Sequence, residues 1–122
     1  MIQINNDLTL SMLKEQFNKM FPYLKIEFFK HRHKNLEGSP KKDLLCQDYA
    51  LKQFRKKNEP LVLNGSILVS DLEDQFQNLF GLSTQVFRRS GKAWIETSVT
   101  DDWSLDKQNE AGKELSELVQ KA

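Results

Sequence analysis

The sequence predicts an α+β fold in which a β-α-β-β-α unit of about 60 residues occurs twice. The segment LSMLKEQFNKMF, residues 10–21, recurs as VSDLEDQFQNLF, residues 69–80, with the same residue at five of twelve positions. The segments IQIN and LVLN precede the two copies, and DYAL and DWSL follow them. Matched apolar spacing is common to all amphipathic helices, but matched Ser and Gln residues and matched flanks indicate an internal duplication.

The duplication predicts a single domain over residues 1–122, made of pseudo-repeats at about 1–60 and 61–122. The offset between the copies falls from 59 to 54 residues along the chain, and HKNLEGSPKK is the expected site of the extra residues in the first copy. A unit of this size buries so little surface that it would be only marginally stable alone. We therefore expect one shared core, with the central helices packed on a mostly antiparallel sheet about a pseudo-twofold axis.

Each unit is expected to begin with a strand and a helix. Residues 2–4 and 61–63 are short apolar segments typical of strands. Residues 10–21 and 69–80 repeat apolar side chains at i, i+3, i+7, i+10 and i+11, which is one face of a helix. The candidate N-caps are Thr9, Ser11, Ser66 and Ser70, and the expected stop signals are Pro22 and Gly81.

Two strands are expected after each central helix. In the second copy, residues 83–89 and the return segment KAWIETSV flank a Ser-Gly turn, which is typical of a hairpin. A turn at residues 90 and 91 would place Phe87 opposite Trp94 and Arg89 opposite Lys92. In the first copy, the corresponding strands are expected at residues 24–30 and 43–46.

Each unit is then expected to end in a helix opened by an aspartate. Asp48 precedes the first of these helices, and Asp101 and Asp102 precede the second. Acidic side chains stabilise the start of a helix through its free N–H groups and its dipole.

The composition favours a protein of the cytoplasm. Hydrophobic residues make up 39% of the chain and supply a core, while 29% charged residues supply a hydrated surface. The single cysteine, Cys46, excludes an internal disulfide. The first residues lack the pattern of a secretory signal, and no apolar stretch reaches the roughly 20 residues that a membrane span needs. We therefore expect no membrane association.

Charge is divided unevenly along the chain. Residues 1–60 contain 12 Lys and Arg and 7 Asp and Glu, a net charge of +5, whereas residues 61–122 contain 6 and 10, a net charge of −4. The two halves could attract each other, or the basic half could offer a face to an anionic partner.

No cofactor or metal motif is evident in the sequence. His31 and His33 alternate in a way that places both imidazoles on one strand face, but the chain has no other His, and the flanking basic residues would repel a cation. The segment RRSGK lacks the spacing of a phosphate loop, and its Gly lies between two expected strands. We expect no cofactor, no metal and no catalytic residues.

The candidate binding residues lie in two segments, the RRSGK hairpin tip and the TDDW loop. The tip gathers cations that could contact an anion, and the loop joins acidic side chains to a Trp, which is enriched in interface hot spots. These candidates are Arg88, Arg89, Lys92, Asp101, Asp102 and Trp103.

The C-terminal half carries a recognisable pattern. Residues 85–91 read QVFRRSG, residues 94–97 read WIET and residues 100–109 read TDDWSLDKQN. With KIEFFKHRHK and GSPKK earlier in the chain, this pattern resembles a family of small bacterial proteins to which no activity is assigned. The resemblance covers most of the chain and implies a bacterial cytoplasmic protein without supplying catalytic residues.

We expect a non-catalytic protein-interaction module, with an unidentified protein partner or a second copy of the chain bound through an exposed strand edge or the TDDW surface. The first alternative is binding of nucleic acid or another polyanion through the basic first half and the hairpin tip. The second alternative is an enzyme that uses Glu96, Asp101 or the His pair.

Overall fold

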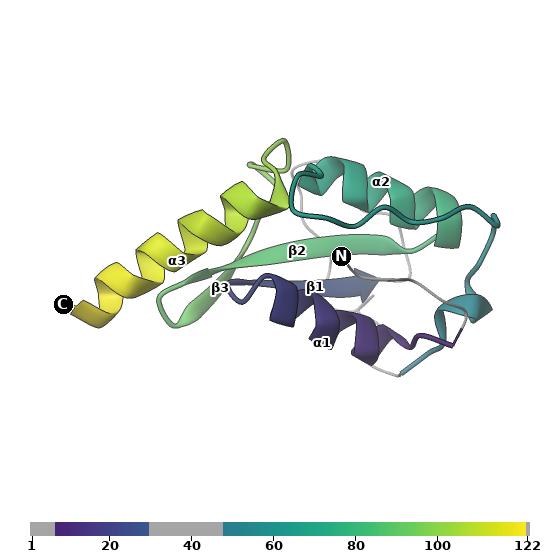
Figure 1. Cartoon of the computed structure of the whole chain (residues 1–122), viewed down its shortest axis with the longest axis horizontal. Coiled ribbons are helices and arrows are strands. Elements are labelled where there is room, and N and C mark those ends of the chain that lie inside the picture. The colour runs from purple at the N-terminus through teal and green to yellow at the C-terminus, as the bar shows by residue number, and fades with distance from the viewer. Residues whose placement is uncertain (1–6, 30–47, 122) are drawn as a thin grey trace.

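The computed structural model describes residues 7–29 and 48–121, with side chains described up to residue 117. Within these residues, three α-helices and a three-stranded antiparallel sheet form an α+β domain, which confirms the predicted class (Figure 1). None of the described helices combines the length and apolar character needed to cross a membrane. The elements in chain order are α1 (Leu10–Met20), β1 (Leu24–Phe29), η2 (Leu51–Gln53), α2 (Val69–Phe80), β2 (Ser83–Ser90), β3 (Ala93–Glu96) and α3 (Leu105–Lys121).

The sheet has the strand order β1-β2-β3, so its central strand pairs with a strand from each half of the chain. β1 is antiparallel to β2, with Leu24 opposite Arg88 and Phe29 opposite Ser83. Helices α1 and α2 lie along the sheet, and α3 runs beside the β2–β3 hairpin, with its C-terminal end beyond the turn (Figure 1). The direct pairing of β1 with β2 therefore joins the two halves of the sequence.

The core lies on one face of the sheet. Leu24, Ile26 and Phe28 alternate along β1 and are fully buried, and the ring of Phe28 contacts that of Phe76 in α2 at 5.1 Å. Buried side chains from α1, α2, Leu61 and Leu63 belong to the same cluster. Each buried large apolar side chain contributes about 1.5–3 kcal/mol, so this cluster is the main source of stability.

The central helices α1 and α2 occupy the predicted residues, but their N-terminal caps differ from each other. Thr9 is the N-cap of α1 and its hydroxyl accepts from the Met12 N–H at 3.2 Å, as predicted. The predicted Ser caps of α2 are wrong, because its N-cap is Leu68 and makes no side-chain capping bond. At the other end, Gly81 ends α2 with φ of 66°, the left-handed conformation that the stop signal predicted.

Distant loops supply backbone hydrogen bonds to the first N–H group of α1 and of α2. At α1, the Leu10 N–H donates to the Tyr49 carbonyl at 2.8 Å, and the Leu51 N–H donates to the Leu8 carbonyl at 2.9 Å. These bonds flank an isolated β-bridge between Thr9 and Ala50.

The start of α2 repeats this arrangement. The Val69 N–H donates to the Trp103 carbonyl at 3.0 Å, and the Leu105 N–H donates to the Ile67 carbonyl at 3.0 Å. These bonds flank the isolated bridge between Leu68 and Ser104. The residues of the first set correspond to those of the second at offsets of 59 and 54, the two offsets found in the sequence.

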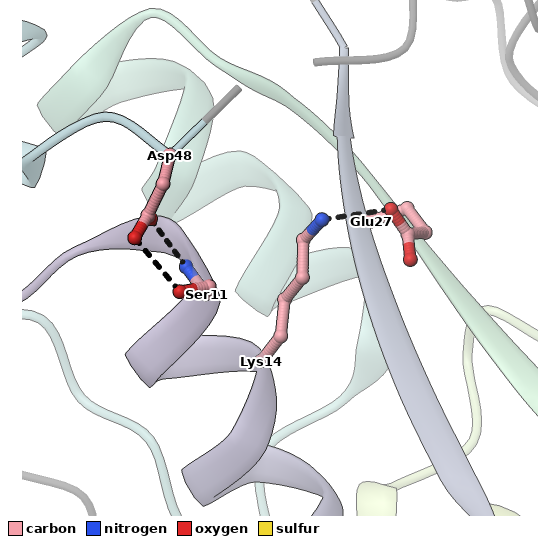
Figure 2. Close-up of polar contacts among 4 residues, drawn as sticks. All are labelled: Ser11, Lys14, Glu27 and Asp48. Carbon is pink, nitrogen blue, oxygen red and sulfur yellow. Dashed lines mark hydrogen bonds and ion pairs between the residues drawn. The ribbon is translucent and has the colours of Figure 1, made fainter. Parts of the chain in front are cut away.

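Asp48 caps α1 instead of opening the next helix, which corrects the predicted role. Its carboxylate accepts from the Ser11 N–H at 3.0 Å and from the Ser11 hydroxyl at 2.9 Å (Figure 2). The backbone bond, followed by the hydroxyl bond, lowers the pKa of Asp48. Beside it, Lys14 forms an ion pair with Glu27 at 3.0 Å, which ties α1 to β1.

Two elements expected from the sequence are absent from the described part of the chain. Residues 61–63 form no strand, because the Gln75 side chain in α2 accepts from the Val62 N–H at 2.8 Å and donates to the Val62 carbonyl at 3.0 Å. The helix expected after Asp48 is only the three-residue η2, since the segment RKKNEP after Phe54 has no apolar side chain to bury. The expected strands at residues 2–4 and 43–46 lie outside the described residues.

Helix α3 begins at Leu105, with a cap other than the predicted aspartates. The Ser104 hydroxyl accepts from the Lys107 N–H at 3.1 Å, whereas the Asp101 carbonyl accepts from the Ser70 N–H at 2.7 Å at the start of α2. The loop that contains Asp101 and Asp102 therefore pairs with N–H groups at the start of α2, and the predicted role of these aspartates in opening α3 is wrong.

The hairpin register differs from the predicted one by two residues. The turn lies at Gly91 and Lys92, and Arg89 is opposite Trp94. Two-residue turns favour glycine at the first central position, where Gly91 has φ of 62°. A shift of two residues keeps each side chain on its face, so Phe87 and Trp94 remain on the same face as diagonal neighbours.

Replacement of Gly81 by Ala should lower stability by about 1–2 kcal/mol, because a side chain disfavours the left-handed conformation. Gly81→Asn should lose less, since Asn tolerates this region. Urea denaturation of the wild type and both variants measures the difference. Equal stability of Gly81→Ala and the wild type would contradict the role of Gly81 as the helix terminator.

Candidate interaction surface

β3 is an edge strand whose outer side is unpaired within the described residues. The Thr97 N–H donates to the Val86 carbonyl at 3.2 Å, which makes this pair a hydrogen-bonded one. Backbone direction alternates along an antiparallel strand, so Ile95 also faces β2 while Trp94 and Glu96 direct their N–H and C=O groups away from it. Four backbone hydrogen-bonding groups therefore point outwards at this edge.

Two cations and two aromatic rings lie together on the sheet face opposite the core. The Lys25 Nζ lies 5.1 Å from the ring centroid of Phe87 and 5.3 Å from that of Trp94. The Arg89 guanidinium lies 5.3 Å from the same Trp94 ring. We call Lys25, Phe87, Arg89 and Trp94 the cation–aromatic cluster. Each contact contributes about 0.5–1 kcal/mol at an exposed site, which is enough to orient these side chains.

The cations of this cluster have no carboxylate partner among the described residues. The ion pairs found there are Lys14 with Glu27 and Lys19 with Glu15. The Arg89 Nε donates to the Gly91 carbonyl at 2.7 Å, which leaves the two terminal nitrogens of its guanidinium without a described hydrogen bond. The cluster therefore presents unpaired positive charge next to the open edge of β3.

Arg88 points to the opposite face, where it is part of the support for α3. Its guanidinium donates to the Gln108 side chain at 3.0 Å, and the fully buried Gln108 donates to the Thr100 carbonyl and hydroxyl, both at 2.7 Å. Gly112 allows this close packing, because an added Cβ would lie 2.9 Å from Tyr23. The network fixes the loop that follows β3 against α3.

Trp103 belongs to this second face. It is half-buried, with the Arg88 guanidinium 5.5 Å and the Lys107 Nζ 4.3 Å from its ring centroid. Its carbonyl, with that of Asp101, accepts N–H groups at the start of α2. The TDDW loop therefore has a structural role that accounts for much of its composition.

The six sequence-predicted site residues do not form one surface. Arg88 and Trp103 lie together on the core face, Arg89 lies on the other face, and Lys92 is exposed in the turn. Asp101 is half-buried and Asp102 is exposed in the TDDW loop. The sequence interpretation omitted Lys25 and Phe87 as site residues, although alternation along residues 24–29 and 83–89 places both on the outward face.

An acidic group beside the TDDW loop has an unusual protonation state. Burial, together with the charges of Asp101 and Asp74, raises the pKa of Glu73 to about 8. Burial and then the neighbouring Asp102 also raise the pKa of Asp101.

No group of three or more His, Cys, Asp or Glu side chains in the described part of the chain could hold a metal ion. His31 and His33 lie outside the described residues.

Comparison of the chain with protein-family models, curated proteins and solved structures finds no match. The resemblance to a bacterial family therefore stays a prediction, and the assignment of function depends on the surface itself.

The raised pKa of Glu73 predicts how stability depends on pH. The folded protein retains a proton that the unfolded chain releases near pH 4.5, so stability should fall as the pH rises from about 4.5 to about 8. Glu73→Gln should match the wild type near pH 5 and exceed its stability near pH 9 by about 1 kcal/mol, allowing for partial exposure.

Urea denaturation at several pH values measures this difference, with Glu114→Gln, an exposed glutamate of α3, as the matched control. The same pH dependence in Glu73→Gln and the wild type would contradict the assignment.

Proposed function

We propose that this protein is a non-catalytic protein-interaction module that binds an extended segment of a partner protein along the open edge of β3. The observation that carries the proposal is the outward direction of the Trp94 and Glu96 backbone groups, which no described residue pairs. An extended peptide can add to such an edge as a further strand, with backbone bonds that supply affinity and side-chain contacts that supply specificity.

The side chains around the edge support this mode of binding. Ile95 is 37% exposed and lies on the face opposite Trp94, while Val99, just beyond the strand, is 80% exposed. A bound strand would present alternate side chains to these two different faces. The edge spans only the four residues of β3, so we expect a short segment and modest affinity.

The matched contacts at the starts of α1 and α2 support a second proposal, that the two halves are diverged copies of one unit. The equivalent bridges, Thr9 with Ala50 and Leu68 with Ser104, occur at the offsets found in the sequence. In this view, β1 and β2 are equivalent strands paired about a pseudo-twofold axis, and β3 is the return strand of the second copy.

The alternatives have less support. Binding of a polyanion at the hairpin requires its cations to share one surface, but Arg88 and Arg89 lie on opposite faces and Arg88 is engaged by Gln108. An enzyme that uses Glu96 or Asp101 requires groups that converge, but Glu96 is on the exposed edge and Asp101 lies in the loop at the start of α2. A second copy of the chain remains an alternative occupant of the same edge.

Peptides selected on the wild-type protein test the proposal. The probe is a phage library of random peptides about ten residues long, enough to form a strand. Selected peptides are synthesised, and their affinities are measured by fluorescence polarisation on two variants. Glu96→Pro removes one outward N–H while leaving the ladder with β2 intact, and Glu96→Ala removes only the side chain.

We expect Glu96→Pro to weaken binding by about 10-fold or more, which corresponds to about 1.4 kcal/mol. Glu96→Ala should weaken binding by no more than about 3-fold, because an exposed charged side chain contributes less than about 1 kcal/mol. Circular dichroism verifies that both variants fold. Failure to select any binding peptide, or equal affinity for Glu96→Pro and the wild type, would contradict the proposal. Light scattering of the wild type without peptide reports self-association. A wild-type dimer that is lost in Glu96→Pro would show that a second copy of the chain, and not a partner peptide, occupies the β3 edge.

A further inference from the structure

The cation–aromatic cluster lies where it would contact one side chain of a strand bound at β3. A residue that pairs with Trp94 across the edge directs its side chain to the same face as Trp94, with the two Cβ atoms about 4.5–5.5 Å apart. The charged ends of Lys25 and Arg89 lie 5.3 Å from the Trp94 ring centroid, although the two residues belong to β1 and β2. Both charges therefore lie beside the ring of the edge residue Trp94.

Charge complementarity defines the side chain that fits this position. The two cations lack a described carboxylate partner, and the terminal nitrogens of Arg89 can form the paired hydrogen bonds that arginine makes with a carboxylate. The half-buried Trp94 ring beneath them limits hydration and so strengthens the attraction. Aspartate and glutamate are the side chains that supply this group.

We infer that the partner segment carries an aspartate or glutamate opposite Trp94, and that Lys25 and Arg89 bind its carboxylate. This inference rests on the proposed binding of an extended segment at the β3 edge. Glu96 lies two residues further along the same face and is exposed. A cation is therefore favoured at the position of the segment opposite Glu96, and a continuous run of anions is disfavoured. The site consequently fits an acid-bearing peptide better than a nucleic-acid strand.

The test repeats the peptide selection on three variants. Arg89→Gln and Lys25→Gln each remove one charge from the cluster, and Lys52→Gln removes an exposed charge from η2 as the matched control. Peptides selected on the wild type and on Lys52→Gln should be enriched in an acidic residue at one fixed position, and peptides selected on Arg89→Gln should lose this enrichment.

Affinities of paired peptides give the quantitative measure. Exchange of the enriched acidic residue for its amide should weaken binding to the wild type by about 10-fold at low salt, and binding to Arg89→Gln by less than about 2-fold. Lys25→Gln should give an intermediate loss, which keeps the test valid if Arg89→Gln folds poorly.

The two proposals fail in different ways. Peptides that bind in a Glu96→Pro-sensitive manner without an acidic preference would overturn the carboxylate site and leave the edge-binding function intact. The absence of Glu96→Pro-sensitive peptides would overturn both. A single-stranded DNA oligonucleotide serves as a parallel probe. If it binds the wild type more tightly than Arg89→Gln, and the selected peptides show no acidic preference, the cluster would be assigned to nucleic-acid binding.

Discussion

The pairing of β1 with β2 is the interaction on which the rest of this structure depends. The two strands come from different halves of the chain, and their register places Ile26 opposite Val86 at the centre of the buried face. A unit of about 60 residues buries only about 60% of the surface that its unfolded chain exposes, so each half alone would be marginally stable. The pairing of β1 with β2 brings both central helices to the same sheet, where they complete one core. The ring contact between Phe28 of β1 and Phe76 of α2 is part of this core.

The pairing of β1 with β2 also determines where a partner can bind. Because β2 is central, its second neighbour β3 becomes an edge, and the outward face receives Lys25 from one half and Trp94 from the other. Polar support lies on the opposite face, where Gln108 holds Arg88 and the Thr100 loop in place. β2 and the loop that follows β3 are therefore held from behind by α3, while the outer backbone groups of β3 stay unpaired within the described residues.

The sequence predicted several elements whose signals are local, and several of its errors lie where distant residues decide. Apolar spacing located α1 and α2, and Gly81 marked the end of α2, because these patterns act within one helix. The predicted strand at residues 61–63 was wrong because the Gln75 side chain of α2 pairs with the backbone of Val62 at its centre. The cation–aromatic cluster was missed because Lys25 reaches Trp94 only through the pairing of β1 with β2, strands from different halves of the chain, which no local pattern specifies.

Amide hydrogen exchange of the free protein, measured by NMR spectroscopy, tests most directly whether β3 offers an open edge. The strand alternates in direction, so the account predicts slow exchange for the Ile95 and Thr97 amides, which face β2, and fast exchange for the Trp94 and Glu96 amides, which face outwards. Slow exchange at all four amides would show that the edge is already paired, and it would contradict the proposed binding of a partner strand.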